Sequence, residues 1–355
     1  MSLDFSQYGG PSEEWLAVQK TLPAMTFDVN ADPVALRSAV NTERENRTAA
    51  AFIDLAAQVE TADYSIPTRD GSSIQARTYR SVEKSKSEKL PVYIYFHGGG
   101  FLFGTLSSED FTCAQTAINT GVIVLNVNYR HTPEHVFPTA WHDSQDALAW
   151  LHKNIDTVGG DPTKVLVGGV SAGGQLAASL VLEQHLGKSE VLKGLPAVAG
   201  QILIIPCVAH PETYEQGPGK KLKVSSYVEN EHAPVLPKTT IDFFMGLLKV
   251  DTPDFKDTKV NIVNATEDEV KGLPPTVFGI AGLDPLRDEA LLYAKLLAEA
   301  NVPTEIRLFR GVPHGHRRFG KALKASEHWD QCIDEGILWA LSKPTATGKF
   351  DVKLP

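Results

Sequence analysis

The sequence predicts an α/β fold in which a mostly parallel sheet is flanked by helices. From about residue 56 onward, short runs rich in β-branched and aromatic residues alternate with longer amphipathic runs. Several of the short runs are almost entirely apolar, as expected for strands that are covered by helices on both faces.

The alternation predicts eight strands, and the turn Asp70-Gly71-Ser72 indicates that the first two form a hairpin. The predicted strands are residues 63–67, 74–79, 92–96, 122–127, 165–169, 202–205, 276–280 and 304–309. The clearest predicted helices are residues 139–154, 171–186, 238–249, 287–300 and 326–341. Residues 1–55 also have a helical pattern, with Trp15, Leu16, Leu36 and Val40 as candidate apolar contacts.

One interval interrupts the alternation of strands and helices. Between Ile205 and Thr276 lie about seventy residues with many prolines, and a gap of this length is usually a functional insertion. We expect it to form, with the N-terminal helices, a cap over one edge of the sheet. The predicted division is a helical cap from residues 1–55 and 206–250, and an α/β domain from residues 56–205 and 251–355.

Composition excludes several classes of protein. The 355 residues are 42% hydrophobic and 22% charged, which is ordinary for a globular chain. The net charge of −9 disfavours binding to nucleic acid. No run approaches the ~18 apolar residues of a membrane helix, and the first residues lack the pattern of a signal peptide. The cysteines, Cys113, Cys207 and Cys332, are far apart, which fits a reducing compartment. We therefore expect a cytoplasmic protein.

The strongest chemical motif is the pentapeptide 169–173, Gly-Val-Ser-Ala-Gly, which fits the pattern G-x-S-x-G. An apolar strand precedes it and a helix follows it, which is the context of a nucleophile elbow. The glycines allow a sharp turn that exposes the Ser171 hydroxyl above the sheet. A helix N-cap serine in a small-residue turn is the alternative.

A second motif, His97-Gly98-Gly99-Gly100, follows a predicted strand. Glycines at this position can present N–H groups to an oxyanion, because no side chain blocks access to them. The alternative is a flexible glycine turn. A phosphate-binding loop is excluded because no Gly-Lys-Ser/Thr follows, and the spacing does not fit a dinucleotide-binding motif.

Acids and histidines then follow two later strands, in the chain order serine, acid, histidine. Asp284 lies close to a strand end, whereas Asp288 and Glu289 fall in a first helical turn, where the helix dipole alone favours carboxylates. His314 and His316 both follow the final predicted strand and compete for the role of base. Both groups lie at the carboxyl ends of strands, where sites form in α/β proteins.

One segment suggests a different chemistry. Residues 131–135, His-Thr-Pro-Glu-His, match the H-x-x-E-H pattern of inverted zincins. That zinc site requires both histidines on one helical face, and Pro133 opposes a helix there. A third ligand with suitable spacing is also missing, so we predict no metal site.

Together these motifs resemble the hormone-sensitive-lipase-like group of esterases in the α/β-hydrolase superfamily. The landmarks, all in the family order, are residues 97–100, 128–134, 169–174, 284–288 and 314–315. The resemblance implies a serine hydrolase with a triad of Ser171, Asp284 and His314. It also implies an oxyanion hole and a surrounding motif or substrate pocket. The oxyanion hole would use the N–H groups of Gly98, Gly99 and Ala172, and the pocket would include His97, Gly100, Phe101, Gly169 and Gly173.

Four residues depart from the family pattern. Val170 stands where the family usually has an acidic residue, His131-Thr132 where it often has Leu-Ala, and His316 where it often has an aromatic residue. None of them removes a member of the triad. The Gly315 that follows His314 fits the family's His-Gly pairing, which favours His314 as the base.

We therefore expect a serine carboxylesterase that hydrolyses short- to medium-chain acyl esters through an acyl-enzyme intermediate. It would need no cofactor and no metal, would take a small-molecule ester, and could form a homodimer. The alternatives are an amidase or deacetylase acting on a small metabolite, which uses the same triad, and a non-catalytic small-ligand receptor of the same fold.

Overall fold

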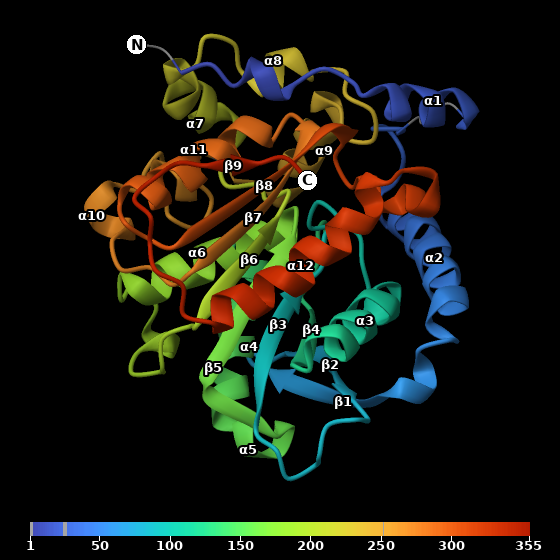
Figure 1. The fold of residues 1–355 in the computed structure, drawn as a ribbon, viewed down its shortest axis with the longest axis vertical. Helices are drawn as coiled ribbons and strands as arrows, with labels where there is room; N and C mark the ends of the chain where they lie inside the picture. Colours follow the sequence, from blue (N-terminus) through green and yellow to red (C-terminus); the bar gives the residue numbers. More distant parts are fainter. Residues whose placement is uncertain (1–2, 24–26, 251) are drawn as a thin grey trace.

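The structure is a computed structural model that describes residues 3–23, 27–250 and 252–355. Its centre is one nine-stranded sheet with the strand order β1-β2-β4-β3-β5-β6-β7-β8-β9. The β1–β2 and β2–β4 pairs are antiparallel, and all later pairs are parallel (Figure 1). The predicted fold class is therefore confirmed.

All eight predicted strands are present, and β9 is an addition that the sequence pattern did not predict. The strands are β1 Val59–Pro67, β2 Ser73–Ser81, β3 Leu90–Phe96, β4 Ile123–Asn128, β5 Gly160–Val170, β6 Gly200–Ile204, β7 Thr276–Leu283, β8 Thr304–Pro313 and β9 Val352–Lys353. The last strand has only two residues and pairs with the edge strand β8 at Ile306 and Arg307. Two residues are too few to show the alternation of apolar and polar side chains that predicts a strand.

Helices cover both faces of the sheet and create two hydrophobic cores. On one face lie α3 (Asp110–Thr120) and α12 (Ala325–Leu341), side by side in Figure 1. On the other lie α4 (Thr139–Lys153), α6 (Ala172–His185) and α11 (Arg287–Glu299). Side chains alternate along each strand, so Val165 and Val167 enter one core while Leu166 enters the other.

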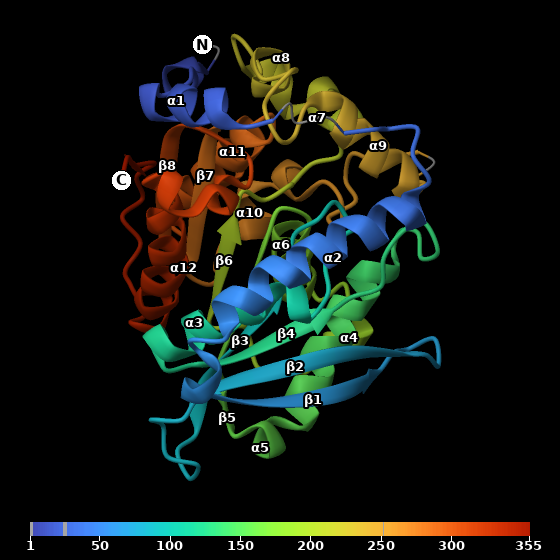
Figure 2. The same cartoon turned by 90° about the vertical axis from the view of Figure 1, so that its right-hand side faces the viewer.

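The remaining helices gather mainly at one end of the molecule. They are α1 Glu13–Thr21, α2 Pro33–Phe52, α7 Pro211–Gln216, α8 Ser226–Glu229 and α9 Lys238–Leu248, with the short α5 Ile155–Val158 and α10 Glu267–Val270 elsewhere. In Figure 2, α1, α7, α8 and α9 lie beyond the end of the sheet toward which β6 points. Among the described residues, no helix combines the length and the hydropathy needed to cross a membrane.

Three of the four apolar contacts predicted near the N-terminus are confirmed. Trp15 is fully buried against Phe319, and Leu36 and Val40 pack partly buried against the core. The prediction for Leu16 is wrong, because its side chain is 41% exposed. In α1, Trp15 is on the side that faces the protein and Leu16 is on the exposed side.

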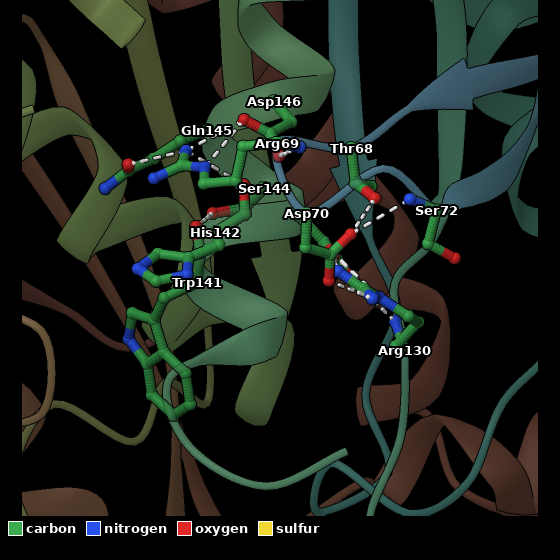
Figure 3. A network of polar contacts seen from close by, with 11 residues as sticks. Thr68, Arg69, Asp70, Ser72, Arg130, Trp141, His142, Ser144, Gln145 and Asp146 are labelled. Carbon is green, nitrogen blue, oxygen red and sulfur yellow. Dashed lines mark hydrogen bonds and ion pairs between the residues drawn. The ribbon is translucent and has the colours of Figure 1, made fainter. Parts of the chain in front are cut away.

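The segment 128–134, one of the family landmarks, contributes a structural anchor. Arg130 makes a bidentate ion pair with the buried Asp143 of α4 and a further contact, 2.6 Å, with Asp70 in the β1–β2 turn. In the same turn, Arg69 binds Asp146 of α4 through both its backbone N–H and its Nε (Figure 3). These contacts fix the antiparallel hairpin to the parallel part of the molecule.

Candidate active site

Ser171 occupies a strained turn between β5 and α6. Its φ of 55° and ψ of −116° are unusual for a residue with a side chain, and the residue is half-buried. The neighbouring glycines are required because the backbones approach closely. A Cβ at Gly169 would lie 2.5 Å from the backbone of Gly173, and a Cβ at Gly173 would lie 2.0 Å from the carbonyl oxygen of Phe96. The turn has the geometry of a nucleophile elbow.

Two loops bring His314 and Asp284 to this serine. His314 follows the end of β8, and its Nε2 lies 3.0 Å from Ser171 Oγ. Asp284 follows the end of β7, and its Oδ2 lies 2.7 Å from His314 Nδ1. The other carboxylate oxygen accepts the backbone N–H of Leu286 at 2.9 Å. With Nδ1 bonded to a carboxylate, the neutral ring keeps its proton there and leaves Nε2 to accept the hydroxyl proton.

The competing acids are engaged in other contacts. Asp288 binds Arg287 and the backbone N–H of Ser226, both at 2.7 Å. Glu289 accepts the backbone N–H of Val208 at 2.6 Å, and complete burial raises the pKa of this carboxyl to about 8. Of the three acids considered, only Asp284 is in contact with a histidine.

The competing histidine packs into the core on the α12 face of the sheet. The buried ring of His316 packs against Phe309 and Trp329, with centroids 5.0 Å away in each case. This desolvation lowers the pKa of His316 to about 3, so its imidazole is neutral. His316 therefore occupies an aromatic cluster, which agrees with the family's preference for an aromatic residue at this position.

The glycine loop after β3 lies directly over the elbow. A Cβ at Gly98 would be 2.9 Å from the carbonyl oxygen of Val170, and a Cβ at Gly100 would overlap the ring of Phe244 in α9. In the part of the chain that the structure describes, the N–H groups of Gly98, Gly99 and Ala172 have no hydrogen-bond acceptor. Unpaired donors beside a serine hydroxyl can stabilise an oxyanion.

Other residues of the motif support the loop. The buried ring of His97 stacks on Tyr129, with centroids 4.4 Å apart, and the Tyr129 hydroxyl donates to the His97 carbonyl at 2.8 Å. Burial lowers the pKa of His97 to about 4, so the ring is neutral. Phe101, a predicted member of the motif or substrate pocket, is buried, and its ring stacks on that of Trp141 with centroids 4.9 Å apart.

The H-x-x-E-H segment forms a turn rather than a helix. The ring of His131 lies 5.2 Å from that of His97, and Glu134 makes an ion pair with Arg37 of α2. The described residues contain no group of three or more His, Cys, Asp and Glu side chains arranged to hold a metal ion.

Known proteins support the fold assignment. A family model described as alpha/beta hydrolase fold matches residues 93–317. The chain belongs to this family. The resemblance inferred from the motifs is therefore confirmed.

Three relatives of this α/β hydrolase span most of its length. Carboxylesterase NlhH of Mycobacterium tuberculosis is 33% identical over 67% of this chain and 70% of its own. Versiconal hemiacetal acetate esterase of Dothistroma septosporum is 32% identical over 77% of this chain and 80% of its own. A crystal structure of vibralactone cyclase superposes with a TM-score of 0.86, at 26% identity, over 97% of this chain and 98% of its own.

Proposed function

We propose that this chain, a carboxylic ester hydrolase, works as a serine esterase with Ser171 as the nucleophile. The observation that carries the proposal is the hydrogen-bonded series from Ser171 Oγ through His314 to Asp284, with separations of 3.0 Å and 2.7 Å. Nucleophile, base and orienting acid are thus in the order that acyl transfer requires.

The same geometry defines the steps. His314 Nε2 takes the hydroxyl proton as Ser171 Oγ attacks the ester carbonyl carbon, and Asp284 stabilises the resulting imidazolium. The N–H groups of Gly98, Gly99 and Ala172 receive the oxyanion, each contributing a factor of ~10² to 10³ in rate. The ester C–O bond then breaks, and the leaving alcohol takes the proton from His314. Water, activated by the same histidine, hydrolyses the acyl-enzyme.

The proposed substrates are esters with short- to medium-chain acyl groups. Aromatic side chains from both parts of the proposed cap, residues 1–55 and 206–250, meet the glycine loop. Phe27 packs against Phe103 at 6.4 Å and against Phe244 at 5.8 Å, and Phe244 lies over Gly100. This wall restricts the space near the oxyanion donors, and the name of the Dothistroma relative specifies an acetate ester.

Two assays test this proposal. A fluorophosphonate probe should label the wild-type protein and leave the Ser171→Ala variant unlabelled, since the probe reacts with an activated serine. Hydrolysis of p-nitrophenyl esters with two to sixteen acyl carbons should be fastest at the short end. Labelling that persists in Ser171→Ala would refute the nucleophile, and a preference for sixteen carbons would refute the substrate class.

A second candidate is acyl transfer to a hydroxyl within the same substrate, which closes a lactone. The observation that favours it is the superposition on vibralactone cyclase, which extends over 97% of this chain and so includes the cap helices. If the bound acyl group carries a hydroxyl, that hydroxyl can attack the acyl-enzyme ester in place of water. The product is then a lactone instead of a carboxylic acid. Mass spectrometry of the products from a hydroxyacyl thioester or ester distinguishes the two, since the hydrolysed acid is one water heavier than the lactone.

A further inference from the structure

The turn that carries Asp284 is built from a short stretch between β7 and α11. Both carboxylate oxygens of Asp284 are already used, one by His314 and one by the Leu286 N–H. Its side chain therefore points correctly only if the backbone of the turn is held in place. The first helical residue after the turn is Arg287, and the N-cap position is Leu286, whose side chain supplies no hydrogen bond. An uncapped helix start leaves unsatisfied N–H groups.

Ser226, at the start of α8, supplies the missing cap from sixty residues away in the chain. Its hydroxyl accepts the N–H of Asp288 at 3.1 Å and donates to the carbonyl of Pro285 at 2.6 Å. In return, the Asp288 carboxylate accepts the N–H of Ser226 at 2.7 Å. This is the reciprocal exchange of a capping box, made here between two helices instead of within one.

Asn230, directly after α8, contacts the acid residue itself. Its side-chain N–H donates to the backbone carbonyl of Asp284 at 3.2 Å. Both Ser226 and Asn230 are buried, so water cannot replace either contact cheaply. The same surface is extended by Tyr227, whose hydroxyl donates to Glu289 at 3.0 Å, and by Glu229, which pairs with the buried Arg287 at 2.8 Å.

We infer that Ser226 and Asn230 are positioning residues that hold Asp284 against His314. Residues 226–230 of the insertion are then part of the structure that keeps the triad aligned. This inference rests on the proposed function, because it assigns the two residues to the triad acid. A consequence is that residues 226–230 cannot swing away from the sheet during turnover without misplacing Asp284. Any opening of the site has to occur on the side of α9 and the N-terminal segment.

The test is a comparison of Ser226→Ala and Asn230→Ala with Ser225→Ala. Ser225 is a matched control, since its hydroxyl caps α8 by accepting the Tyr227 N–H at 3.2 Å but has no contact with the acid turn. We expect kcat for p-nitrophenyl acetate to fall by ~10- to 100-fold in Ser226→Ala and Asn230→Ala, with KM unchanged, because small displacements of catalytic groups have effects of this size. Ser225→Ala should stay within about twofold of wild type.

A double-mutant cycle separates positioning from general destabilisation. In an Asp284→Asn background, adding Asn230→Ala should slow fluorophosphonate labelling by less than about twofold, because the group that it positions is already disabled. The inference would be overturned if folded Ser226→Ala and Asn230→Ala kept the full wild-type kcat. It would also be overturned if the effects of Asp284→Asn and Asn230→Ala on the labelling rate multiplied in the double variant. If Ser226→Ala does not fold, Asn230→Ala alone decides. Full activity of Asp284→Asn would instead refute the proposed triad.

Discussion

The turn that carries Asp284 and the glycine loop that carries Gly98 and Gly99 are each held by a segment of the proposed cap, but the contacts differ in burial. The acid turn is fastened by α8 through side chains that are almost completely buried. The glycine loop is fastened by α2, a helix of twenty residues with no buried residue. The two sides of one active site thus depend on contacts of different strength.

On the α2 side, polar residues spaced three or four apart form the contact. Asn41 accepts the N–H of Gly104 at 2.8 Å, and Arg44 donates to the carbonyl of Gly98 at 3.2 Å. Glu45 accepts the hydroxyl of Thr105 at 2.6 Å. This spacing aligns the side chains on one helical face. Because water can substitute for half-exposed partners, each contact should be worth less than its buried counterpart on α8.

The largest effect should come from the acid itself. Asp284→Asn should lower kcat by about 10⁴-fold, because an amide cannot hold the His314 tautomer or stabilise its cation as a carboxylate does. Steady-state kinetics on p-nitrophenyl acetate measures this. A drop of less than about tenfold would mean that another group orients the base.

The next largest effect should be a loss of folding stability caused by a change at the turn that carries Asp284. Asp288→Asn breaks the buried pair with Arg287 and weakens the exchange with Ser226, so the free energy of unfolding should fall by about 3 kcal/mol. The folded fraction should retain a kcat far above that of Asp284→Asn. Urea denaturation and kinetics on the same samples test both statements, and the reverse ranking of the two variants in kcat would contradict the assignment of the acid.

The turn that carries Asp284 and the glycine loop should also contribute to the pH dependence of folding stability with opposite signs. The pKa of Glu289, raised to about 8 by burial, means that the folded state binds more protons than the unfolded one, so this contribution to stability is lost as pH rises toward 8. The pKa of His97, lowered to about 4, makes stability fall as pH falls from 6.5 toward 4. Glu289→Gln should therefore flatten the decline of Tm between about pH 4.5 and 8. An unchanged slope over this range in Glu289→Gln would exclude this carboxyl as its source.

The smallest effect should come from α2. Asn41→Ala should cost about 1 kcal/mol of stability, the usual size for one hydrogen bond, and should lower kcat by a few-fold through a looser glycine loop. Thr42→Ala is a suitable control, because its exposed hydroxyl donates to the backbone carbonyl of Ser38 on the same helix. If Asn41→Ala proves as costly as Asn230→Ala in kcat, the difference between the two regions does not hold.

The sequence was most informative where function depends on neighbouring residues. The elbow around Ser171 and the loop 97–100 are local patterns, and the positions of Asp284 and His314 follow from strand ends, which a parallel sheet brings together. Ser226 and Asn230 could not be predicted. A serine and an asparagine in a proline-rich insertion have no periodic pattern, and their partners lie more than fifty residues away.

The short strand β9 has a consequence for how copies of this chain can associate. An edge strand offers unpaired backbone groups to any other strand, and sheets commonly extend across such edges. At the β8 edge the chain's own residues Val352 and Lys353 already pair with Ile306 and Arg307. A homodimer that continued the sheet there would have to compete with a tethered segment, whose effective concentration is far above that of a free partner. Residues 352–353 thus compete with any second copy for pairing with Ile306 and Arg307 at this edge.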